Sequence, residues 1–496
     1  MPNLIDSVNL IKFANVMFKM RIFIFLITFF VVKSFAQTKK TIEYFTYNEN
    51  VLQQDIAILK EVLLNIHPSI DFYAAKEWYK NYFDTALIVH QPMTEKMFRL
   101  FLKRKLLVLR CGHTAILPSK KYDRYLNKKS FIILPYFMGY FEPYLISVKN
   151  IDSKDTLLKA MDTIVSINHK PVSDYAKEFE DYLYVDAFAV ASKREMIQKN
   201  FIFYYSAIYE NDSVLIEQVK YNKLINKKIP FKKFKYLNNN ILWQMKSDTL
   251  MKKYGGRYYA GVYLDTNKVI YYMKIKSFSG MSMRHFFKKT FRQLQKNNSQ
   301  VLILDLRNNP GGKIAQSLNL LSYLLPQKDS IMYETRIQNI KHKKYISRKL
   351  EFRIIQFFMQ ISKKHKDKKY VDYIRVNSKY HFNNKIYVLV NANTFSAANL
   401  VAVYLSKRPN TKIIGTETSG ALWGSNAVNF LRLTLPNTKI KCIIPTFRIY
   451  HSMKNDNQNH LLYSILPDIY VHYNPSDYLN KKDKALEGVY FDLMRK

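Results

Sequence analysis

Cysteine and acidic residues are scarce in this sequence, and each shortage narrows what the protein can be. The 496 residues include two cysteines, Cys111 and Cys442, so there is no disulfide framework beyond one possible bridge. Neither cysteine lies in a sequence cluster with metal-ligand spacing, and we expect no metal and no other cofactor. The 38 Asp and Glu are outnumbered by 78 Lys and Arg, which gives a net charge of +40. Such a charge attracts nucleic acid, anionic lipid or an acidic surface.

Motifs that read nucleic acid are also absent. The chain has no zinc-finger spacing, no RNP-type strand and no recognition-helix pattern. The positive charge is mostly Lys and is spread along the whole chain, as a lysine-biased composition gives. We therefore interpret it as a solvated surface and expect no nucleic-acid partner. A protein that binds anions or nucleic acid through charge alone is a further alternative, and it predicts binding with a steep salt dependence.

Long hydrophobic runs are scarce too. One apolar run, Ile22–Val32, follows two basic residues, and the small residues at 34–36 suit a signal peptidase. The run is short for a membrane span, so we interpret residues 1–36 as a signal peptide. We expect an exported mature chain from about Gln37, which is periplasmic, at the cell surface or secreted, without stable membrane insertion. An uncleaved N-terminal anchor is the alternative.

Residues 37–118 are expected to form a small helical domain. The first apolar stripe with helical spacing comprises Leu52, Ile56, Leu59 and Leu63. A second helix is predicted to run from Thr94, its N-cap, to about Leu109. A glycine then breaks the helix within the Cys-Gly-His-Thr sequence at 111–114, which places His113 on the following turn.

Residues 119–185 contain several segments with strand character. The clearest runs of β-branched and aliphatic residues are 131–134, 144–148 and 162–168. The last run and the turn after it resemble the second half of a PDZ domain, with Met161 where that domain usually has glycine. This resemblance implies an exposed strand edge that captures an extended peptide by β-augmentation. An unspecialised β-rich spacer is the alternative, and residues 186–256 are expected to be a β-rich connecting segment.

Residues 257–496 alternate strand and helix patterns. Strands are predicted at 269–275 and 301–306, and each is followed by a segment with helical spacing of apolar residues. A long basic insertion, residues 327–384, precedes the next strand. This βαβα order predicts an α/β layer with a largely parallel core. The insertion could be a lid, a docking surface or a tolerated loop.

A strand that leads directly into a helix lies at residues 386–400. The apolar run Ile386–Val390 predicts a buried strand, a polar corner follows, and a helical pattern begins near Ala397. Ser396 lies at this junction, where free N–H groups and the positive end of the helix dipole stabilise negative charge. A serine nucleophile that forms a tetrahedral oxyanion needs such a place. The alternative is that Ser396 is only an N-cap, which is the commonest use of serine there.

A second corner follows the strand at 301–306. It ends in Pro310, Gly311 and Gly312, and such a corner lets backbone N–H groups point into a site without obstruction by side chains. Its strand comes before the Ser396 strand in an alternating segment. We therefore expect the two corners to meet at one edge of the sheet.

Three motifs, in this order, resemble the signature of the C-terminal-processing and tricorn-core serine peptidases. They lie at residues 304–312, 394–398 and 414–420. The resemblance implies an α/β fold with a ClpP/crotonase-like β-α superhelix as the catalytic domain, preceded by the helical and PDZ-like domains. It also implies that Ser396 is the nucleophile. By the same resemblance, the N–H groups of Gly311, Gly312 and Ala397 form the oxyanion hole.

This family divides by its general base. In the processing-protease branch a lysine follows the glycine that matches Gly420, and this chain has Ala421 there. In the tricorn-like branch the base is a histidine from the helical domain, often within Asp-Gly-His-Thr. The sequence at 111–114 matches this pattern except that cysteine replaces the aspartate. The resemblance therefore implies that His113 takes the proton of Ser396 and returns it to the leaving amine.

The acid that orients His113 has no clear match. The tricorn-like branch has a glutamate shortly before a C-terminal Pro-Asp, and this chain has Leu461 at that position. Glu417 and Asp456 are the two candidates for the orienting acid, and the sequence alone places neither. A serine and a histidine without such an acid still act, but more slowly.

Together these features predict a secreted serine endopeptidase. Its expected partner is an extended or unfolded polypeptide, which the PDZ-like domain brings to Ser396. A catalytically decayed peptide-binding protein of the same fold is the alternative, because of Cys111 and Leu461. The intact Ser396, His113 and Pro-Gly-Gly corner favour the enzyme. The oligomeric state stays open.

Overall fold

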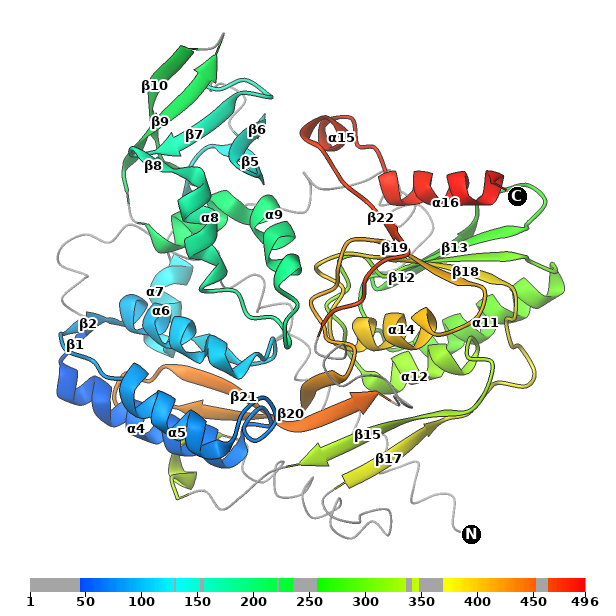
Figure 1. Ribbon diagram of the computed structural model, residues 1–496, viewed down its shortest axis with the longest axis horizontal. Helices are drawn as coiled ribbons and strands as arrows, with labels where there is room; N and C mark the ends of the chain where they lie inside the picture. The colour runs from blue at the N-terminus through cyan, green and yellow to red at the C-terminus, as the bar shows by residue number, and fades with distance from the viewer. Residues whose placement is uncertain are drawn as a thin grey trace.

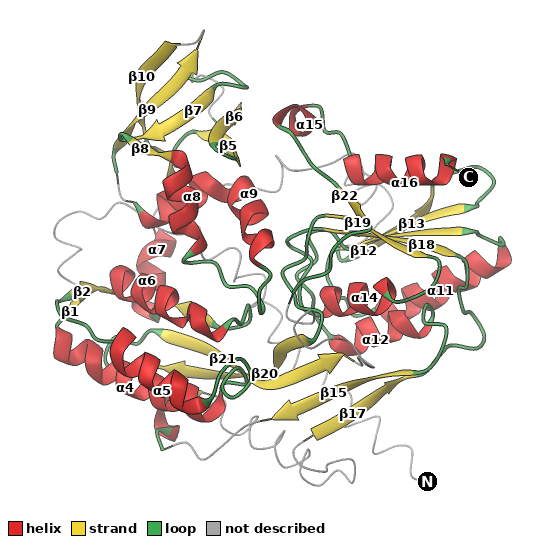
Figure 2. Cartoon of the chain, in the orientation of Figure 1, coloured by secondary structure: helices red, strands yellow, loops and turns green. Residues whose placement is uncertain are grey.

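The structure is a computed structural model, and it describes residues 45–495 except 129–130, 152–155, 210, 221–222, 235–256, 336–340, 348–368 and 452–462. The predicted signal peptide, residues 1–36, lies outside the described residues. In Figures 1 and 2 the N-terminal helices lie over two long C-terminal strands, a β-rich domain lies above them, and a parallel sheet lies beside both.

The N-terminal part is helical, as predicted. Its elements are β1 (Thr46–Tyr47), α4 (Glu49–Ile66), α5 (Lys76–Ala86), β2 (Met93–Thr94), α6 (Glu95–Leu106) and the 3-10 turn η2 (Leu107–Leu109). Thr94 caps α6, since its side chain accepts a hydrogen bond from the Met97 N–H at 3.2 Å. The helix α5 escaped prediction because it buries only Tyr79 and Phe83, which is too few for a recognisable stripe.

These helices share a hydrophobic core with the far end of the chain. They pack on β20 (Gly424–Thr434) and β21 (Lys441–His451), whose buried apolar side chains join those of α4 and α6 in one cluster. Asp55 of α4 accepts hydrogen bonds from the N–H groups of Asn437 and Thr438 at 2.9 Å each. The turn between β20 and β21 is thereby fastened to the first long helix.

Residues 131–234 form a β-rich domain, named here the middle domain. After α7 (Lys120–Lys128), its elements are β4 (Phe131–Ile133), β5 (Tyr136–Phe141), β6 (Tyr144–Asn150), β7 (Thr163–Ile167), β8 (Lys170–Pro171), α8 (Val172–Glu180), α9 (Val190–Ile208), β9 (Ser213–Lys220), β10 (Lys223–Pro230) and β11 (Lys232–Phe234). Its main sheet has the order β10-β9-β7-β6-β5. The sheet extends past residue 185, the expected end of the PDZ-like domain, because β9 pairs with β7 and β10 with β9.

The expectation of a β-rich connecting segment at 186–256 is wrong for its first part. Residues Val190–Ile208 form the helix α9, which packs on β5 and α8. Its aromatic run at 201–205 has high strand propensity, but these side chains are buried all round the helix. A helix buried on every side lacks the one-sided apolar pattern by which a helix is recognised in a sequence.

The C-terminal part contains the predicted parallel sheet. Its strand order is β12-β13-β14-β18-β19-β22, and every neighbouring pair except β12 with β13 is parallel. The strands are β12 (Tyr259–Tyr263), β13 (Ile270–Ile275), β14 (Val301–Asp305), β18 (Lys385–Val390), β19 (Thr411–Gly415) and β22 (Ile469–Tyr470).

Helices cover both faces of this sheet. They are α11 (Met283–Lys296), α12 (Ile314–Ser322), α14 (Ala397–Ser406) and α16 (Lys484–Met494), whereas the short helix α15 (Pro475–Leu479) contacts β6 of the middle domain. The helices α11, α12 and α14 share one core with one face, and α16 shares a second core with the other. Burial on both faces explains why β14 and β18 are continuous apolar runs rather than alternating patterns.

A second sheet joins distant segments of the chain. Its order is β16-β20-β21-β15-β17, and β3 (Ala115–Leu117) pairs with β21. The strands β15 (Asp329–Thr335), β16 (Ile346–Ser347) and β17 (Lys369–Ile374) belong to the basic insertion at 327–384. The described part of the insertion therefore extends a sheet rather than forming a free loop. Residues 336–340 and 348–368 of it lie outside the described residues.

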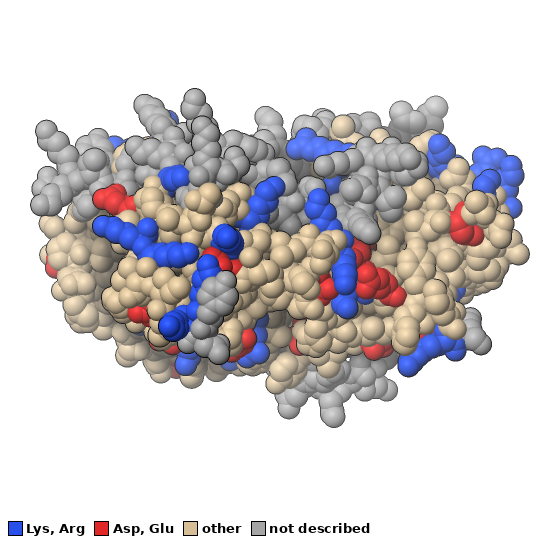
Figure 3. Space-filling model, turned by 90° about the horizontal axis from the view of Figure 1, so that it is seen from above, with Lys and Arg blue, Asp and Glu red and all other residues tan. Residues whose placement is uncertain are grey.

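The surface charge is distributed. On the face seen in Figure 3, Lys and Arg occur in several separate groups with Asp and Glu among them. None of the helices within the described ranges has the length and apolar character needed to span a bilayer.

Candidate active site

Ser396 lies on a sharp turn between β18 and α14. Its backbone has φ 54° and ψ −123°, which residues other than glycine rarely adopt. The Thr394 N–H donates to the Asn391 carbonyl at 2.8 Å, and the Thr394 hydroxyl accepts from the Asn391 N–H at 3.0 Å. The Ser396 side chain makes no capping hydrogen bond. The N-cap alternative is therefore wrong: Ser396 occupies the N-cap position, but its hydroxyl does not cap.

The Pro-Gly-Gly corner lies against Ser396, as expected. The strands β14 and β18 are parallel neighbours, and the Phe395 N–H donates to the Asn309 carbonyl at 3.0 Å. Gly311 has φ 98°, and a Cβ placed on it would lie 2.7 Å from the Cβ of Ser396 and 2.9 Å from the Ala397 nitrogen. Only glycine fits so close to the turn.

The N–H groups expected to form the oxyanion hole differ in their partners. The Gly311 N–H already donates to Oδ1 of Asn309 at 2.9 Å. The N–H groups of Gly312 and Ala397 have no acceptor among the described residues. Two of the three predicted donors are thus available to an oxyanion.

A pair of asparagines fastens the two corners together. The Asn308 N–H donates to Oδ1 of Asn391 at 2.9 Å, and Nδ2 of Asn391 donates to Oδ1 of Asn308 at 2.9 Å. These reciprocal bonds connect the loops after β14 and β18 beside Ser396. This pairing could not be predicted from the sequence, since the two residues lie on different loops.

A buried ion network fixes the start of the Pro-Gly-Gly loop. Nη2 of Arg307 donates to Oδ2 of Asp305 at 2.7 Å, and Nη1 donates to Oδ1 of Asp483 at 2.6 Å. Burial by itself would raise the pKa of Asp305, but the charges of Arg307 and Lys274 outweigh it and hold the pKa below its ordinary value. Asp305 therefore stays ionised and keeps its bonds to Arg307.

His113 is buried beside the Ser396 turn, immediately before β3. Its ring stacks on Phe395, with ring centroids 4.5 Å apart, and lies 6.0 Å from the ring of Phe430. Gly112 permits this approach, because a Cβ there would lie 2.6 Å from the Phe395 ring. Neither ring nitrogen of His113 has a hydrogen-bond partner among the described residues, so no hydrogen bond joins it to Ser396.

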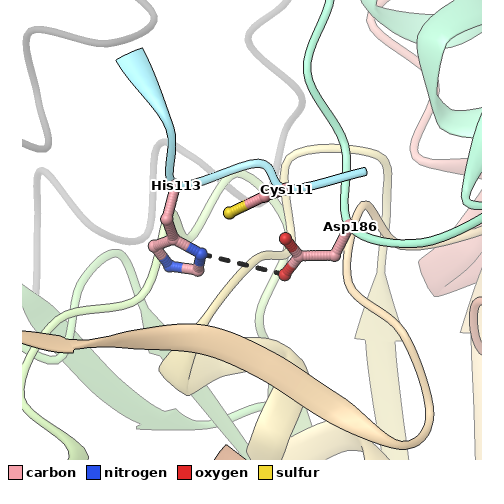
Figure 4. A group of neighbouring side chains, drawn as sticks. All are labelled: Cys111, His113 and Asp186. Atoms are coloured by element: carbon pink, nitrogen blue, oxygen red, sulfur yellow. Dashed lines mark ion pairs between the residues drawn. The ribbon is translucent and has the colours of Figure 1, made fainter. Parts of the chain in front are cut away.

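Asp186 is the acid nearest to His113, and the sequence did not reveal it. Its Oδ2 lies 3.8 Å from Nδ1 of His113, and its Oδ1 accepts the Gly112 N–H at 2.7 Å (Figure 4). The Asp186 N–H donates to the Ser419 carbonyl at 3.1 Å. The Ala187 N–H donates to the Arg110 carbonyl at 3.0 Å, so the loop after α8 is tied to the His113 loop.

Of the two acids proposed from the sequence, Glu417 forms no ion pair with His113 among the described residues. Oε2 of Glu417 accepts a hydrogen bond from the Ser464 hydroxyl at 2.8 Å. Its carboxylate is thereby engaged away from the histidine. Asp456 and Leu461 lie in 452–462, outside the described residues.

The position of the alternative lysine base is closed. Ala421 is fully buried and packs in a cluster with Ala187 and Trp423. A Cβ on the preceding Gly420 would lie 2.3 Å from Nδ2 of Asn399, which itself donates to the Ala421 carbonyl at 3.0 Å. This segment has no space for a longer side chain.

Cys111 completes a buried group with His113 and Asp186. One ligand atom from each residue lies within 4.8 Å of the other two, although neither cysteine had been expected to lie in a metal-ligand cluster (Figure 4). Burial, and then the charge of Asp186, raise the pKa of the Cys111 thiol to about 12. The thiol is therefore protonated at neutral pH and is not a nucleophile.

The middle domain reaches the Ser396 turn through α9. Oε2 of Glu195 accepts the Ala392 N–H at 3.0 Å and also a hydrogen bond from the Thr416 hydroxyl. Burial favours the neutral form of Glu195, but Lys199 outweighs this effect and lowers the pKa of the carboxyl. A charged side chain of the middle domain thus helps to support the Ser396 turn.

Comparison with known proteins agrees with this geometry. The model of peptidase family S41 matches residues 269–471, a segment that contains the Pro-Gly-Gly corner and the Ser396 turn. Among curated proteins, no sequence matches this chain.

Solved structures resemble the chain over nearly its whole length. Mature CPAF complexed with lactacystin is similar at a TM-score of 0.59 and 13% identity, covering 90% of this chain and 98% of that chain. Mature CPAF alone is similar at a TM-score of 0.57 and 13% identity, covering 89% of this chain and 96% of that chain. At such low identity the likeness concerns the fold alone, and it agrees with the predicted α/β fold class.

Proposed function

We propose that this chain, whose residues 269–471 match the model of peptidase family S41, is a serine endopeptidase in which Ser396 attacks the peptide bond and His113 is the general base. The observation that carries the proposal is the Ser396 turn. A strained serine whose hydroxyl caps nothing stands at the N-terminus of α14, beside two N–H groups without acceptors among the described residues.

The first half of the reaction follows from this arrangement. Nε2 of His113 takes the proton of the Ser396 hydroxyl while Oγ attacks the carbonyl carbon of the substrate. The carbonyl oxygen becomes negatively charged and accepts hydrogen bonds from the N–H groups of Gly312 and Ala397. The positive end of α14 adds to this stabilisation.

The second half returns the proton and then repeats the cycle with water. The imidazolium of His113 donates its proton to the leaving amine, and the acyl group stays on Oγ of Ser396. A water molecule then gives a proton to His113 and attacks the acyl carbon. The acid product leaves, and Ser396 regains its proton.

Asp186 is proposed as the acid that orients His113, in place of Glu417 and Asp456. The Gly112 N–H holds Oδ1 of Asp186, which leaves Oδ2 directed at Nδ1 of His113. A carboxylate in this position keeps the proton on Nδ1 and leaves the lone pair of Nε2 for the serine. The 3.8 Å contact must shorten when the imidazolium forms, as catalytic contacts often do once substrate is bound.

The experiment is a digest of denatured proteins by the chain from Gln37 onward, read by mass spectrometry. Ser396→Ala and His113→Ala are tested beside it, with circular dichroism to verify folding. We expect both variants to lose activity by about 10⁴-fold or more, because serine and base act as one unit. Loss with Ser396→Ala alone would mean that another residue is the base.

Peptide binding without cleavage is the second candidate function. It is favoured by one observation, that His113 stacks on Phe395 and makes no hydrogen bond to Ser396. A folded wild-type chain that binds denatured protein, cleaves none and resists a covalent serine probe would support this candidate. Labelling that disappears in Ser396→Ala would exclude it.

The middle domain is proposed to capture the extended substrate, as its PDZ-like pattern implies. Its main sheet ends in β10, whose first four side chains are exposed, including Leu224 and Ile225. An edge strand with exposed apolar side chains is a template for addition of another strand. A polypeptide bound at β10 would thereby be attached to the same domain that contacts the Ser396 turn through Glu195.

Export is proposed from the apolar run near the N-terminus. If residues 1–36 are a signal peptide, the mature protein begins near Gln37. Mass spectrometry of the N-terminal peptide from an exporting host tests this directly. Recovery of an intact N-terminus in a membrane fraction would instead support the uncleaved anchor.

A further inference from the structure

Three polar side chains lie close together, and the proposed base His113 is one of them. Cys111 and His113 come from one loop and Asp186 from the loop after α8, and one ligand atom of each lies within 4.8 Å of the other two. Figure 4 shows Nδ1 of His113 directed at Asp186, with the Cys111 sulfur beside both. All three residues are at least nine-tenths buried.

The atoms that face each other have unmet bonding capacity. Nδ1 of His113 and Oδ2 of Asp186 are buried without a hydrogen-bond partner among the described residues, and they are 3.8 Å apart. A buried polar atom without a partner costs about 1–3 kcal/mol. Two such atoms that face each other beside a thiol are typical of a site that binds a ligand.

We propose that Cys111, His113 and Asp186 bind a zinc ion that reversibly inhibits the peptidase. The inhibition rests on the proposed function, because it requires His113 to be the general base. The binding of zinc does not.

The donor set selects zinc. A thiolate, an imidazole nitrogen and a carboxylate oxygen are ligands of Zn²⁺, whereas Mg²⁺ and Ca²⁺ prefer oxygen alone. With bonds of about 2.0–2.3 Å, neighbouring ligands on a tetrahedral zinc lie roughly 3.3–3.8 Å apart. The His113–Asp186 contact of 3.8 Å is already at that spacing. A group within 4.8 Å must therefore close by about 1.5 Å at most.

The ligands also have the supporting bonds that metal sites use. The Gly112 N–H donates to Oδ1 of Asp186 at 2.7 Å, which fixes the carboxylate and leaves Oδ2 for the metal. The Thr114 N–H donates to the Cys111 carbonyl at 3.3 Å, which closes the loop that carries Cys111 and His113. Three ligands leave a fourth position of the tetrahedron for water.

Zinc bound here would block the reaction at Nε2 of His113. Binding releases the thiol proton of Cys111 to solvent and occupies the lone pair of Nδ1 of His113. The neutral ring then carries its proton on Nε2, so that Nε2 donates and cannot accept the Ser396 proton. The same metal takes Asp186 away from its orienting role. Removal of the ion restores both groups.

The cysteine is the residue that makes the site distinctive. In the Asp-Gly-His-Thr pattern that this chain resembles, a carboxylate stands where Cys111 stands here. A thiolate binds Zn²⁺ more tightly than it binds hard cations. The replacement of the carboxylate by cysteine therefore gives the site its selectivity for zinc. Cys442 on β21 offers a matched control. It is also a buried free cysteine, but it belongs to no metal-ligand group among the described residues.

The test measures zinc binding apart from activity. The chelator-treated chain from Gln37 onward is titrated with Zn²⁺ by calorimetry, and Co²⁺ is used as a spectroscopic probe for the thiolate-to-metal charge-transfer band. The same titrations are done with Ser396→Ala, Cys111→Ser, Cys111→Ala and Cys442→Ser, each verified by thermal melting. Cleavage rates with and without Zn²⁺, and after a chelator, are then compared within each active variant.

We expect a single tight zinc ion per chain, a thiolate band with Co²⁺, and inhibition that a chelator reverses. Both Cys111 variants should bind at least about tenfold more weakly, lose the band and escape inhibition, while Cys442→Ser keeps all three properties. Unchanged binding in folded Cys111 variants would overturn the site. Active enzyme that binds no zinc would overturn it too, with the proposed function intact. Cys111-dependent binding by Ser396→Ala supports the site even if the wild type cleaves nothing, in which case only the proposed function fails.

Discussion

The Ser396 corner and the His113 corner of this site are held by different means. Around Ser396, two neighbouring parallel strands, the Asn308–Asn391 pair and the buried bonds of Arg307 fix the backbone. His113 instead rests on the ring of Phe395, and its nearest acid is 3.8 Å away. The proposed nucleophile and oxyanion donors are thus fixed in advance, while the proposed base still has to approach them.

This difference has a chemical reason. Oxyanion stabilisation depends on donors that do not move during the reaction, so the Ser396 corner benefits from rigidity. The base takes up and releases protons, and its hydrogen bonds tighten when substrate excludes water. A loosely bonded base also leaves its nitrogen and its acid accessible to a competing ligand.

The largest effect is expected from breaking the rigid corner at Gly311. In Gly311→Ala the new methyl would lie 2.7 Å from the Cβ of Ser396 and 2.9 Å from the Ala397 nitrogen, at φ 98°. Backbone atoms must move, so we expect kcat to fall by about 10³-fold. Gly488→Ala is the control. Gly488 lies on helix α16, and a Cβ there would be no nearer than 3.6 Å to any neighbouring atom. That variant should keep its activity and gain about 0.5–1 kcal/mol in unfolding free energy. Normal kinetics in Gly311→Ala would contradict the rigid corner.

A smaller effect is expected from breaking the loose corner at Asp186. Asp186→Asn should lower kcat by about 10²-fold, less than the roughly 10⁴-fold loss for a tightly bonded triad aspartate. Glu417→Gln is the matched control and should change kcat less than about twofold, since Glu417 bonds to Ser464. The opposite ranking of the two variants would make Glu417 the orienting acid.

Acid should loosen β21, the strand with which β3, just after His113, pairs. Burial lowers the pKa of His451, at the end of β21, to about 4, and the ring bonds to the Leu422 carbonyl at 2.9 Å. The unfolded chain has the ordinary pKa near 6.5, so it binds the proton first as the pH falls. Stability is therefore complete above pH 6.5 and declines by up to about 3 kcal/mol toward pH 4.

Urea unfolding at several pH values measures this decline. His451→Asn keeps a donor for the Leu422 carbonyl and removes the titrating group, so its stability should depend less on pH in that window. His90→Asn, at an exposed position, should leave the pH dependence as it is in the wild type. Equal pH dependence in all three proteins would exclude His451 as the cause.

The smallest effect is expected far from both corners, at the edge of the middle domain. Leu224 is 67% exposed on β10, and Leu224→Asp should raise KM for a denatured protein several-fold while leaving short peptides unaffected. Phe491→Asp is the control, because Phe491 is 57% exposed on α16. An equal change in both variants, or none in either, would argue against substrate capture at β10.

The sequence predicted the Ser396 corner well because its geometry is local and topological. The strands β14 and β18 are continuous apolar runs followed by small and polar residues, and parallel neighbours bring such corners to one edge. The resemblance to a peptidase family then supplied His113. The position of β3 beside β21 could not be derived, since it depends on pairing across most of the chain.

Asp186 and the metal-ligand group were beyond sequence reasoning for a physical reason. Asp186 lies in a loop without periodicity, and its position is set by bonds to Ser419 and from Ala187 to Arg110. The two ligands Cys111 and His113 are neighbours in sequence, but the third arrives from another domain. The helix α9 was missed because an all-round buried aromatic run has no one-sided pattern.

The pairing of β3 with β21 also sets the time at which the site can exist. The ribosome makes His113 long before residues 441–443, which pair with the strand that follows it. Such long-range pairing forms late, because the intervening chain must first be closed into a loop. In a nascent chain, Ser396 and His113 are therefore not yet close together. The connectivity itself delays peptidase activity until residues 441–443 have been made.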